Sequence, residues 1–184
     1  MAGRAHPGEL TGLEKLPVKD ITCRPIGVIR SPHTKQEETP IQPVFARGVA
    51  GRVELLPEYE EGLRDIEGFS HVYLLYAFDR AKAPRLSVVP YLGDTERGVF
   101  ATRAPCRPNA LGMSLVRLLR REGAVLRIED VDVLDGTPLL DIKPYIGRYD
   151  SREDVRSGWQ DDVDDITARE RGKRGFGSGG TSQE

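Results

Sequence analysis

The sequence predicts a mostly β protein, organised as one small closed or nearly closed barrel of about seven or eight strands with a single short helix. Three observations support this fold class. The apolar runs are short, turn residues separate them, and the most hydrophobic stretch, residues 69–78 (FSHVYLLYAF), is rich in aromatic residues that favour strands. A Rossmann-type fold is not expected, because the match to G-x-G-x-x-G at 175–180 lies in a Gly/Ser tail with no strand before it.

The first half of the chain is expected to contain three strands and the helix. Residues 21–29 and 51–56 are short apolar runs of strand character. A short helix is expected to begin at Pro57 and end near residue 66, because proline suits the first helical turn and the acidic side chains behind it suit the helix dipole. Residues 69–78 predict a central strand that is buried on both faces.

The second half is expected to consist of strands and turns. Shorter strands are predicted at 86–89, 99–102, 124–133 and 139–142. Residues 113–119 are ambiguous, because the leucines in and before this segment have helical spacing whereas its place between strands favours β structure. We expect a strand there.

Composition restricts the class of protein. A chain of 184 residues is long enough for one domain with a true core, and a net charge of −2 excludes a broadly polycationic nucleic-acid binder while leaving room for a local basic site. Cys23 and Cys106 are far apart in no C-x-x-C pattern, and His6, His33 and His71 lack metal-ligand spacing, so neither a disulfide scaffold nor a metal site is expected. No apolar run approaches about 20 residues and no signal-peptide pattern is present, so we expect a cytoplasmic protein with no membrane partner.

Charge and composition also divide the chain into three parts. Residues 1–20 mix Gly, Pro and charges without periodicity, which predicts a flexible N-terminal arm. Residues 21–149 form the barrel domain. Residues 150–184 carry the acidic surplus and end in a Gly/Ser tract, which predicts a charged C-terminal arm or disordered tail whose one large anchor is Trp159.

Residues 98–115 (GVFATRAPCRPNALGMSL) carry the clearest signs of a binding site. Arg103, Arg107 and Asn109 occur within seven residues, and two prolines stiffen the backbone between them. A guanidinium is a planar fork for a carboxylate or phosphate, so ligand contact is favoured, although a structural ion pair stays open. Two more proline-shaped bends, at 31–43 and 134–145, are expected to meet this loop in one cleft. Taken alone, the DGTP sequence in the latter is typical of a hairpin turn.

Four segments together resemble the TrmO family. IGVIRSPHTKQEETPIQP, GLRDIEGFSHVYLLYAFDR, GVFATRAPCRPNALGMSLV and LDGTPLLDIKPY follow the order of that family's signatures over about residues 24–146. The resemblance implies an S-adenosylmethionine-dependent methyltransferase that acts on N6 of threonylcarbamoyladenosine at tRNA position 37. It also implies a small β-barrel and a homodimer.

The resemblance further implies a set of cofactor-binding residues, in which Arg103 would pair with the methionine carboxylate. Asp79 stands at a position that is often His in relatives, and the charged tail replaces the C-terminal domain of many bacterial members. The implied cofactor-binding set is Gln42, Pro43, Val44, Asp79, Arg80, Arg103, Met113, Ser114, Leu115, Asp135, Gly136, Thr137, Pro138 and Leu139.

The catalytic group stays open at this point. Methyl transfer from a sulfonium depends mainly on positioning, but the acceptor nitrogen loses a proton, so a general base would help. By chemistry the candidates are His33, His71, Asp79 and Tyr76, although a histidine in a buried strand, such as His71, is more often structural.

The substrate is the second open question. Arg107 and Asn109 are assigned to the nucleotide or the shape of the site, and Arg30 and Lys35 to phosphate contacts, joined by Arg47, Arg52, Arg85 and Arg97. Two alternatives are a methyltransferase with a small-molecule acceptor and a non-catalytic RNA-binding barrel. The latter would need exposed aromatic residues on its strands, whereas the aromatics here gather in 69–78.

Overall fold

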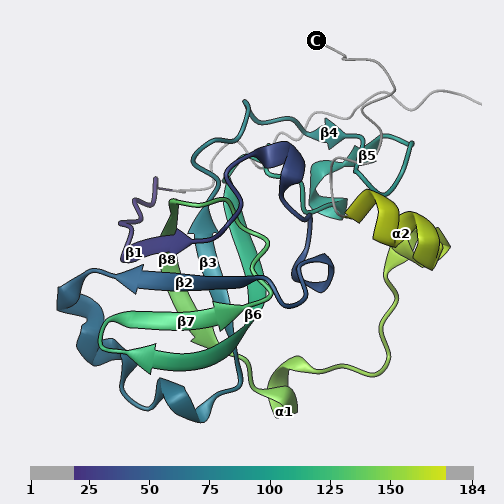
Figure 1. The fold of residues 1–184 in the computed structure, drawn as a ribbon. Coiled ribbons are helices and arrows are strands. Elements are labelled where there is room, and N and C mark those ends of the chain that lie inside the picture. The colour runs from purple at the N-terminus through teal and green to yellow at the C-terminus, as the bar shows by residue number, and fades with distance from the viewer. Residues whose placement is uncertain (1–18, 173–184) are drawn as a thin grey trace, which may run out of the picture.

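Six strands close into an antiparallel barrel in the computed structural model, which describes residues 19–172 (Figure 1). Around the barrel the order is β1-β2-β7-β6-β3-β8, so β8 returns to pair with β1. Two further short strands, β4 (Ser87–Val88) and β5 (Arg97–Gly98), form a separate ribbon. The barrel strands are β1 (Gly27–Arg30), β2 (Ala50–Leu55), β3 (His71–Ala77), β6 (Leu111–Glu122), β7 (Val125–Glu129) and β8 (Thr137–Pro144).

The fold class is therefore as predicted, with differences in strand number and length. The barrel has six strands rather than seven or eight, because the predicted strand at 86–89 belongs to the ribbon and the one at 99–102 is a 3-10 helix, η5 (Val99–Ala101). Thr102 closes that turn by donating its hydroxyl to the Val99 carbonyl at 2.8 Å. The ambiguous segment 113–119 lies within the long strand β6.

The core fills the inside of the barrel. Along β3, Val72, Leu74 and Tyr76 are buried while the residues between them are only half-buried. The prediction that 69–78 is buried on both faces is therefore wrong, because in a single-layer barrel only the inward face reaches the core. The fully buried side chains of the other strands are Ile29, Val53, Val116, Leu126, Ile128 and Leu139.

Short helices connect and cover the strands. The predicted helix at 57–66 is a 3-10 helix, η3 (Pro57–Leu63), followed by η4 (Ile66–Gly68). Asp65, with φ of 67°, separates the two, and Leu63 and Ile66 join the core cluster. The predicted number of helices, one, was too small. The chain also forms η1 (Gln36–Glu38), η2 (Pro43–Phe45), α1 (Gly147–Asp150), η6 (Gly158–Asp162) and α2 (Asp165–Gly172).

The segment after the barrel leaves β8 and ends with α2 beside the ribbon (Figure 1). Trp159 donates its indole N–H to the Ala101 carbonyl at 2.8 Å, and Arg171 forms an ion pair with Asp94 at 2.8 Å. At the end of α2, the Gly172 carbonyl accepts from the Ile41 amide at 2.9 Å. A disordered tail is thus the wrong description for 158–172, because these contacts hold it to the β4–β5 connection, to η5 and to the loop between β1 and β2. The G-x-G-x-x-G match at 175–180 and residues 1–18 of the predicted arm at 1–20 lie outside the described residues.

Among residues 19–172, no helix has the length and apolar character that a membrane span requires.

Candidate functional site

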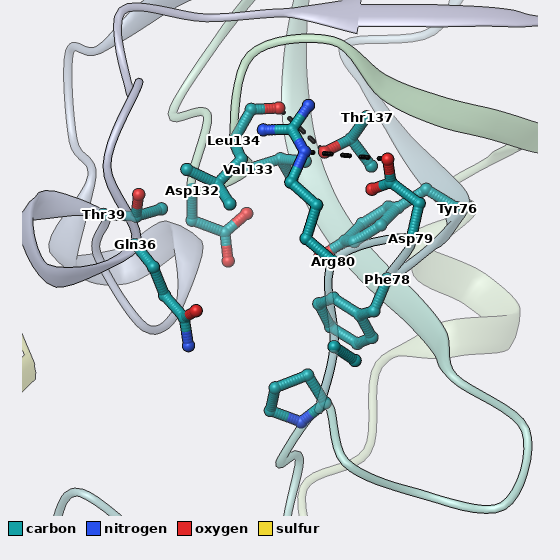
Figure 2. Close-up of a pocket in the computed structure, with 12 residues that line it drawn as sticks. Gln36, Thr39, Tyr76, Phe78, Asp79, Arg80, Asp132, Val133, Leu134 and Thr137 are labelled. Atoms are coloured by element: carbon teal, nitrogen blue, oxygen red, sulfur yellow. Dashed lines mark hydrogen bonds and ion pairs between the residues drawn. The ribbon is translucent and has the colours of Figure 1, made fainter. Parts of the chain in front are cut away.

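The three proline-shaped bends meet in one cleft at an end of the barrel (Figure 2). Gln36 and Thr39 come from the loop between β1 and β2, Pro105 comes from the loop before β6, and Leu134 and Thr137 come from the turn before β8. The end of β3 and the residues after it complete the wall. The remaining lining residues are Tyr76, Phe78, Asp79, Arg80, Ala81, Asp132 and Val133.

A hydrogen-bonded network lies at the inner end of this cleft. The Tyr76 hydroxyl lies 3.0 Å from Ser114 Oγ, and Ser114 Oγ donates to Asp132 Oδ1 at 2.6 Å. Tyr76 and Ser114 are almost completely buried. Gly112 makes room for this arrangement, because a Cβ at that position would lie 2.1 Å from the Tyr76 ring. Strands β3 and β6 thereby bring a phenol and a hydroxyl to a carboxylate from the loop after β7.

Arg80 links the end of β3 to the turn before β8. Its Nη2 donates to the Asp135 carbonyl at 2.8 Å, and its Nε lies 3.6 Å from Asp79 Oδ2 (Figure 2). Gly136 adopts φ of 79°, a conformation that favours glycine, and a Cβ there would lie 3.3 Å from Arg80 Nη2. The turn backbone and Arg80 therefore pack closely, and Thr137 closes the turn by donating to the Leu134 carbonyl at 2.8 Å.

The same turn is held from its other side by β1. The Asp135 carboxylate accepts from the Ser31 amide at 3.1 Å and lies 3.6 Å from Arg30 Nη1. Arg30 also bonds Glu54 at 3.0 Å, and this pairing raises the pKa of Arg30, while hydrogen bonds from Arg52 and Arg30 lower the pKa of Glu54. Arg30, assigned to phosphate contact from the sequence, thus has a structural role in this chain.

Arg103 and Gln42 join two of the loops. The Arg103 guanidinium donates to the Gln42 side-chain oxygen in a short hydrogen bond, which places two of the predicted cofactor residues in contact. Next to Gln42, Pro43 is half-buried and Val44 is exposed. Arg103 is exposed, and neither Arg103 nor Gln42 is among the residues that line the cleft.

Arg107, Asn109 and Lys35 were assigned to substrate contact. Arg107 Nη1 donates to the carbonyls of Thr102 and Ala104 at 3.1 and 3.3 Å, and its guanidinium lies 5.9 Å from the Phe100 ring centroid. It therefore shapes its own loop. Asn109 is exposed and its carbonyl accepts from the Leu111 amide at 2.7 Å, whereas Lys35 pairs with Glu38 at 2.8 Å on the surface.

Several predicted site residues lie away from the cleft. Met113 and Leu115 point outward from β6, because neighbouring side chains of a strand alternate and Ser114 points inward. Leu139 is fully buried in the core, and its neighbour Pro138 pairs with Val28 of β1. His71 begins β3, at the far end of that strand from Tyr76, where its ring contacts Tyr145.

His33 is near the turn but does not line the cleft. Its Nε2 lies 2.9 Å from the Val131 carbonyl, which can only accept, so that nitrogen carries the proton and acts as donor. The main residue that the sequence analysis missed is Asp132. The sequence does contain a sign of it, an acidic residue between two valines, and the structure shows that both Val131 and Val133 are buried.

Comparisons with known proteins agree with this arrangement. A family described as the tRNA-methyltransferase O N-terminal domain matches residues 28–151, which is most of the described chain. The chain belongs to the TrmO family. A similar relative, named a probable S-adenosyl-L-methionine-binding protein of Pyrococcus abyssi, is 57% identical over 139 residues that cover 76% of each protein.

Two further TrmO relatives are longer than this chain. The Escherichia coli protein named tRNA (adenine(37)-N6)-methyltransferase is 35% identical over 73% of this chain and 61% of its own length. The crystal structure of TrmO from Pseudomonas aeruginosa matches 77% of this chain and 63% of its own with a TM-score of 0.65 and 40% identity. The chain thus spans less than two thirds of these relatives.

Proposed function

We propose that this protein is an S-adenosylmethionine-dependent methyltransferase that methylates N6 of adenine 37 in tRNA, and that its natural acceptor is threonylcarbamoyladenosine at that position. One observation carries the proposal: residues from all four segments that resemble the TrmO signatures, distant in sequence, line a single cleft. The names of the relatives supply the reaction class.

Two residues of the predicted cofactor-binding set, Arg103 and Gln42, have side chains whose chemistry fits the cofactor. S-adenosylmethionine supplies a methyl group on a positively charged sulfur and also carries a carboxylate, an amine, a ribose and an adenine. Arg103 offers the planar fork that suits a carboxylate, and Gln42 can hydrogen-bond to an adenine edge or a ribose hydroxyl.

Binding of tRNA would use basic side chains around this rim. Arg47, Arg85 and Lys82 are exposed on the loops that border the cleft. Each phosphate contact releases counterions, so affinity for tRNA should fall steeply with salt. A cytoplasmic location belongs to the same proposal, because the substrate is tRNA.

A homodimer is also proposed, and the outer face of the barrel supports it. Leu111 and Met113 are 53% and 52% exposed, and β3 pairs with this strand so that Leu75 lies opposite Met113 and Tyr73 opposite Leu115. A continuous apolar face of this kind is typical of an interface. In such a dimer, Met113 and Leu115 would be covered by the partner rather than by their own cleft.

The test is methyl transfer from labelled S-adenosylmethionine to bulk tRNA, followed by analysis of the digested nucleosides. The proposal predicts a labelled methyl group on N6 of threonylcarbamoyladenosine. Label on plain adenosine at position 37 would keep the enzyme class and reject the finer acceptor. A protein that binds the cofactor but labels no tRNA favours a small-molecule acceptor, and one that binds tRNA without binding the cofactor favours a non-catalytic RNA-binding barrel.

A further inference from the structure

We propose that Asp132 is the catalytic base of this site, accepting the proton that the acceptor nitrogen loses during methyl transfer, and that Ser114 and Tyr76 position it. This inference rests on the proposed function and adds a role that the sequence analysis did not assign. Its basis is the network at the inner end of the cleft, where a buried hydroxyl holds a carboxylate that lines the cavity.

The direction of the hydrogen bonds is fixed by chemistry. Ser114 Oγ donates to Asp132 Oδ1 at 2.6 Å, and a serine hydroxyl has only one proton to donate. In the bond between Tyr76 and Ser114, at 3.0 Å, Tyr76 must therefore be the donor. The hydrogen bonds thus run from Tyr76 to Ser114 and from Ser114 to the Asp132 carboxylate.

Position also favours Asp132. Figure 2 shows its carboxylate directed into the cleft, between the loop that carries Gln36 and the wall that carries Phe78. The residue lies between Val131 and Val133, which are buried and anchor the backbone on both sides. An anchored backbone and a hydroxyl from β6 fix the carboxylate in one orientation, which is what a general base requires.

The four earlier candidates are less suited to this role. His71 lies at the other end of β3, and His33 is not among the residues that line the cleft. Asp79 is engaged by the guanidinium of Arg80 at 3.6 Å, nearer the rim. Tyr76 already directs its proton toward Ser114, so it supports the carboxylate rather than replacing it.

The proposed step balances without another reactant. The lone pair of the acceptor nitrogen forms the N–C bond while the C–S bond of the sulfonium donor breaks, and its electron pair stays on sulfur as a neutral thioether. The N–H proton moves to Asp132, which becomes a neutral acid and later releases it to solvent. Because the acceptor nitrogen is conjugated, removal of its proton restores a neutral product, and the base assists that step.

The test compares Asp132→Asn with Asp130→Asn. Both changes remove one charge from the same loop, and Asp130 has φ of 69° and accepts from the Gly48 amide, two features that asparagine preserves. We expect Asp132→Asn to lower kcat with tRNA about 10²- to 10⁴-fold, the usual contribution of a general base. Its Kd for S-adenosylmethionine, measured by calorimetry, should stay within about twofold of wild type. Asp130→Asn should leave both values unchanged.

A positioning variant keeps the proposal testable if Asp132→Asn folds poorly. Ser114→Ala should lower kcat by about tenfold, the effect of one orienting hydrogen bond, again with unchanged cofactor Kd. The assignment is overturned if Asp132→Asn keeps kcat within about threefold of wild type, or if it weakens cofactor binding while turnover at saturation is unchanged. An unchanged kcat in Ser114→Ala overturns the positioning role. A wild-type protein that transfers no methyl group would overturn the proposed function itself.

Discussion

Different interactions stabilise the inside of the barrel and its rim: apolar burial inside, and individual polar contacts at the rim. Inside, alternate residues of each strand are apolar and fully buried, as in Val72 and Leu74 of β3. At the rim, the loops are held by single polar links between distant segments, such as Arg103 with Gln42 and Trp159 with the Ala101 carbonyl. The barrel therefore sets where each loop begins, while a few side chains set the shape of the cleft. Substitutions in the barrel core should therefore lower global stability, whereas those at the rim should mainly loosen individual loops.

The largest effect is expected in the barrel. Leu74→Ala removes a fully buried side chain from the centre of the core, and such cavities cost about 2–5 kcal/mol. The free energy of unfolding, measured by urea denaturation, should fall by that amount. Leu86→Ala, at a residue that is 72% exposed, is the control and should change it little. Equal losses in both variants would contradict the division between core and rim.

Gly112 lies between the barrel core and the cleft, and its replacement should have the second-largest effect on stability. A Cβ in Gly112→Ala would overlap the Tyr76 ring, so the ring must shift, at a cost of about 1–3 kcal/mol. Because Tyr76 supports the network at the inner end of the cleft, methyl transfer should fall as well. Gly62→Ala is the matched control, since a Cβ at that position would extend into open space. Gly112→Ala with wild-type stability and activity would show that the ring position is unimportant.

Trp159→Ala tests the rim alone. The change removes the hydrogen bond to Ala101 and the contact with Arg97, whose guanidinium lies 5.8 Å from the ring centroid. We expect a loss of about 1–2 kcal/mol, seen mainly as faster amide exchange in the ribbon and in the loop around Ile41. Tyr149→Ala removes an exposed aromatic from the same segment and should have no such effect. Faster amide exchange throughout the barrel would show that Trp159 stabilises the whole domain and not only the rim, and would contradict this prediction.

The smallest effect concerns the ion pairs around Glu54, which tie the barrel to the rim. Because the folded state lowers the pKa of Glu54, the stabilisation is present above the ordinary pKa of a glutamate and is lost as pH falls through the lowered value. Glu54→Gln should therefore be less stable than wild type at pH 7, by no more than about 1 kcal/mol. The difference should shrink in strongly acidic solution. A difference that is constant or grows as pH falls would contradict this linkage.

The barrel could be predicted from the sequence because its signal is local. Alternation and turn residues set the strands, and β6 was recognised despite its helical leucine spacing. The closure into six strands depends on pairings between distant segments, such as β1 with β8, which no local pattern reports. A strand was also predicted at 99–102 because this segment is apolar, but apolar character alone does not distinguish a short strand from the 3-10 helix η5 that forms there.

The candidate site was predicted in part. The three bends could be expected to converge because their motifs resemble one family, and Gln42 and Arg103 do meet. A motif does not report which way a side chain points, so Met113, Leu115 and Leu139 were included although the strands direct them elsewhere. Asp132, in the loop after β7, was missed because its partner Ser114 is 18 residues away, on β6. Trp159 was predicted as the one large anchor of the C-terminal segment and does hold it, whereas the contacts of Arg171 and Gly172 depend on distant partners that composition cannot reveal.

The most direct test of the account is calorimetric titration of S-adenosylmethionine into the wild-type protein, Arg103→Ala and Arg148→Ala. The account predicts saturable binding to wild type, at least about tenfold weaker binding to Arg103→Ala because a charge-assisted pair is lost, and unchanged binding to Arg148→Ala, whose exposed side chain lies in α1. No binding to the wild-type protein would contradict the assignment of the cofactor, and equal affinity in all three proteins would contradict the role of Arg103.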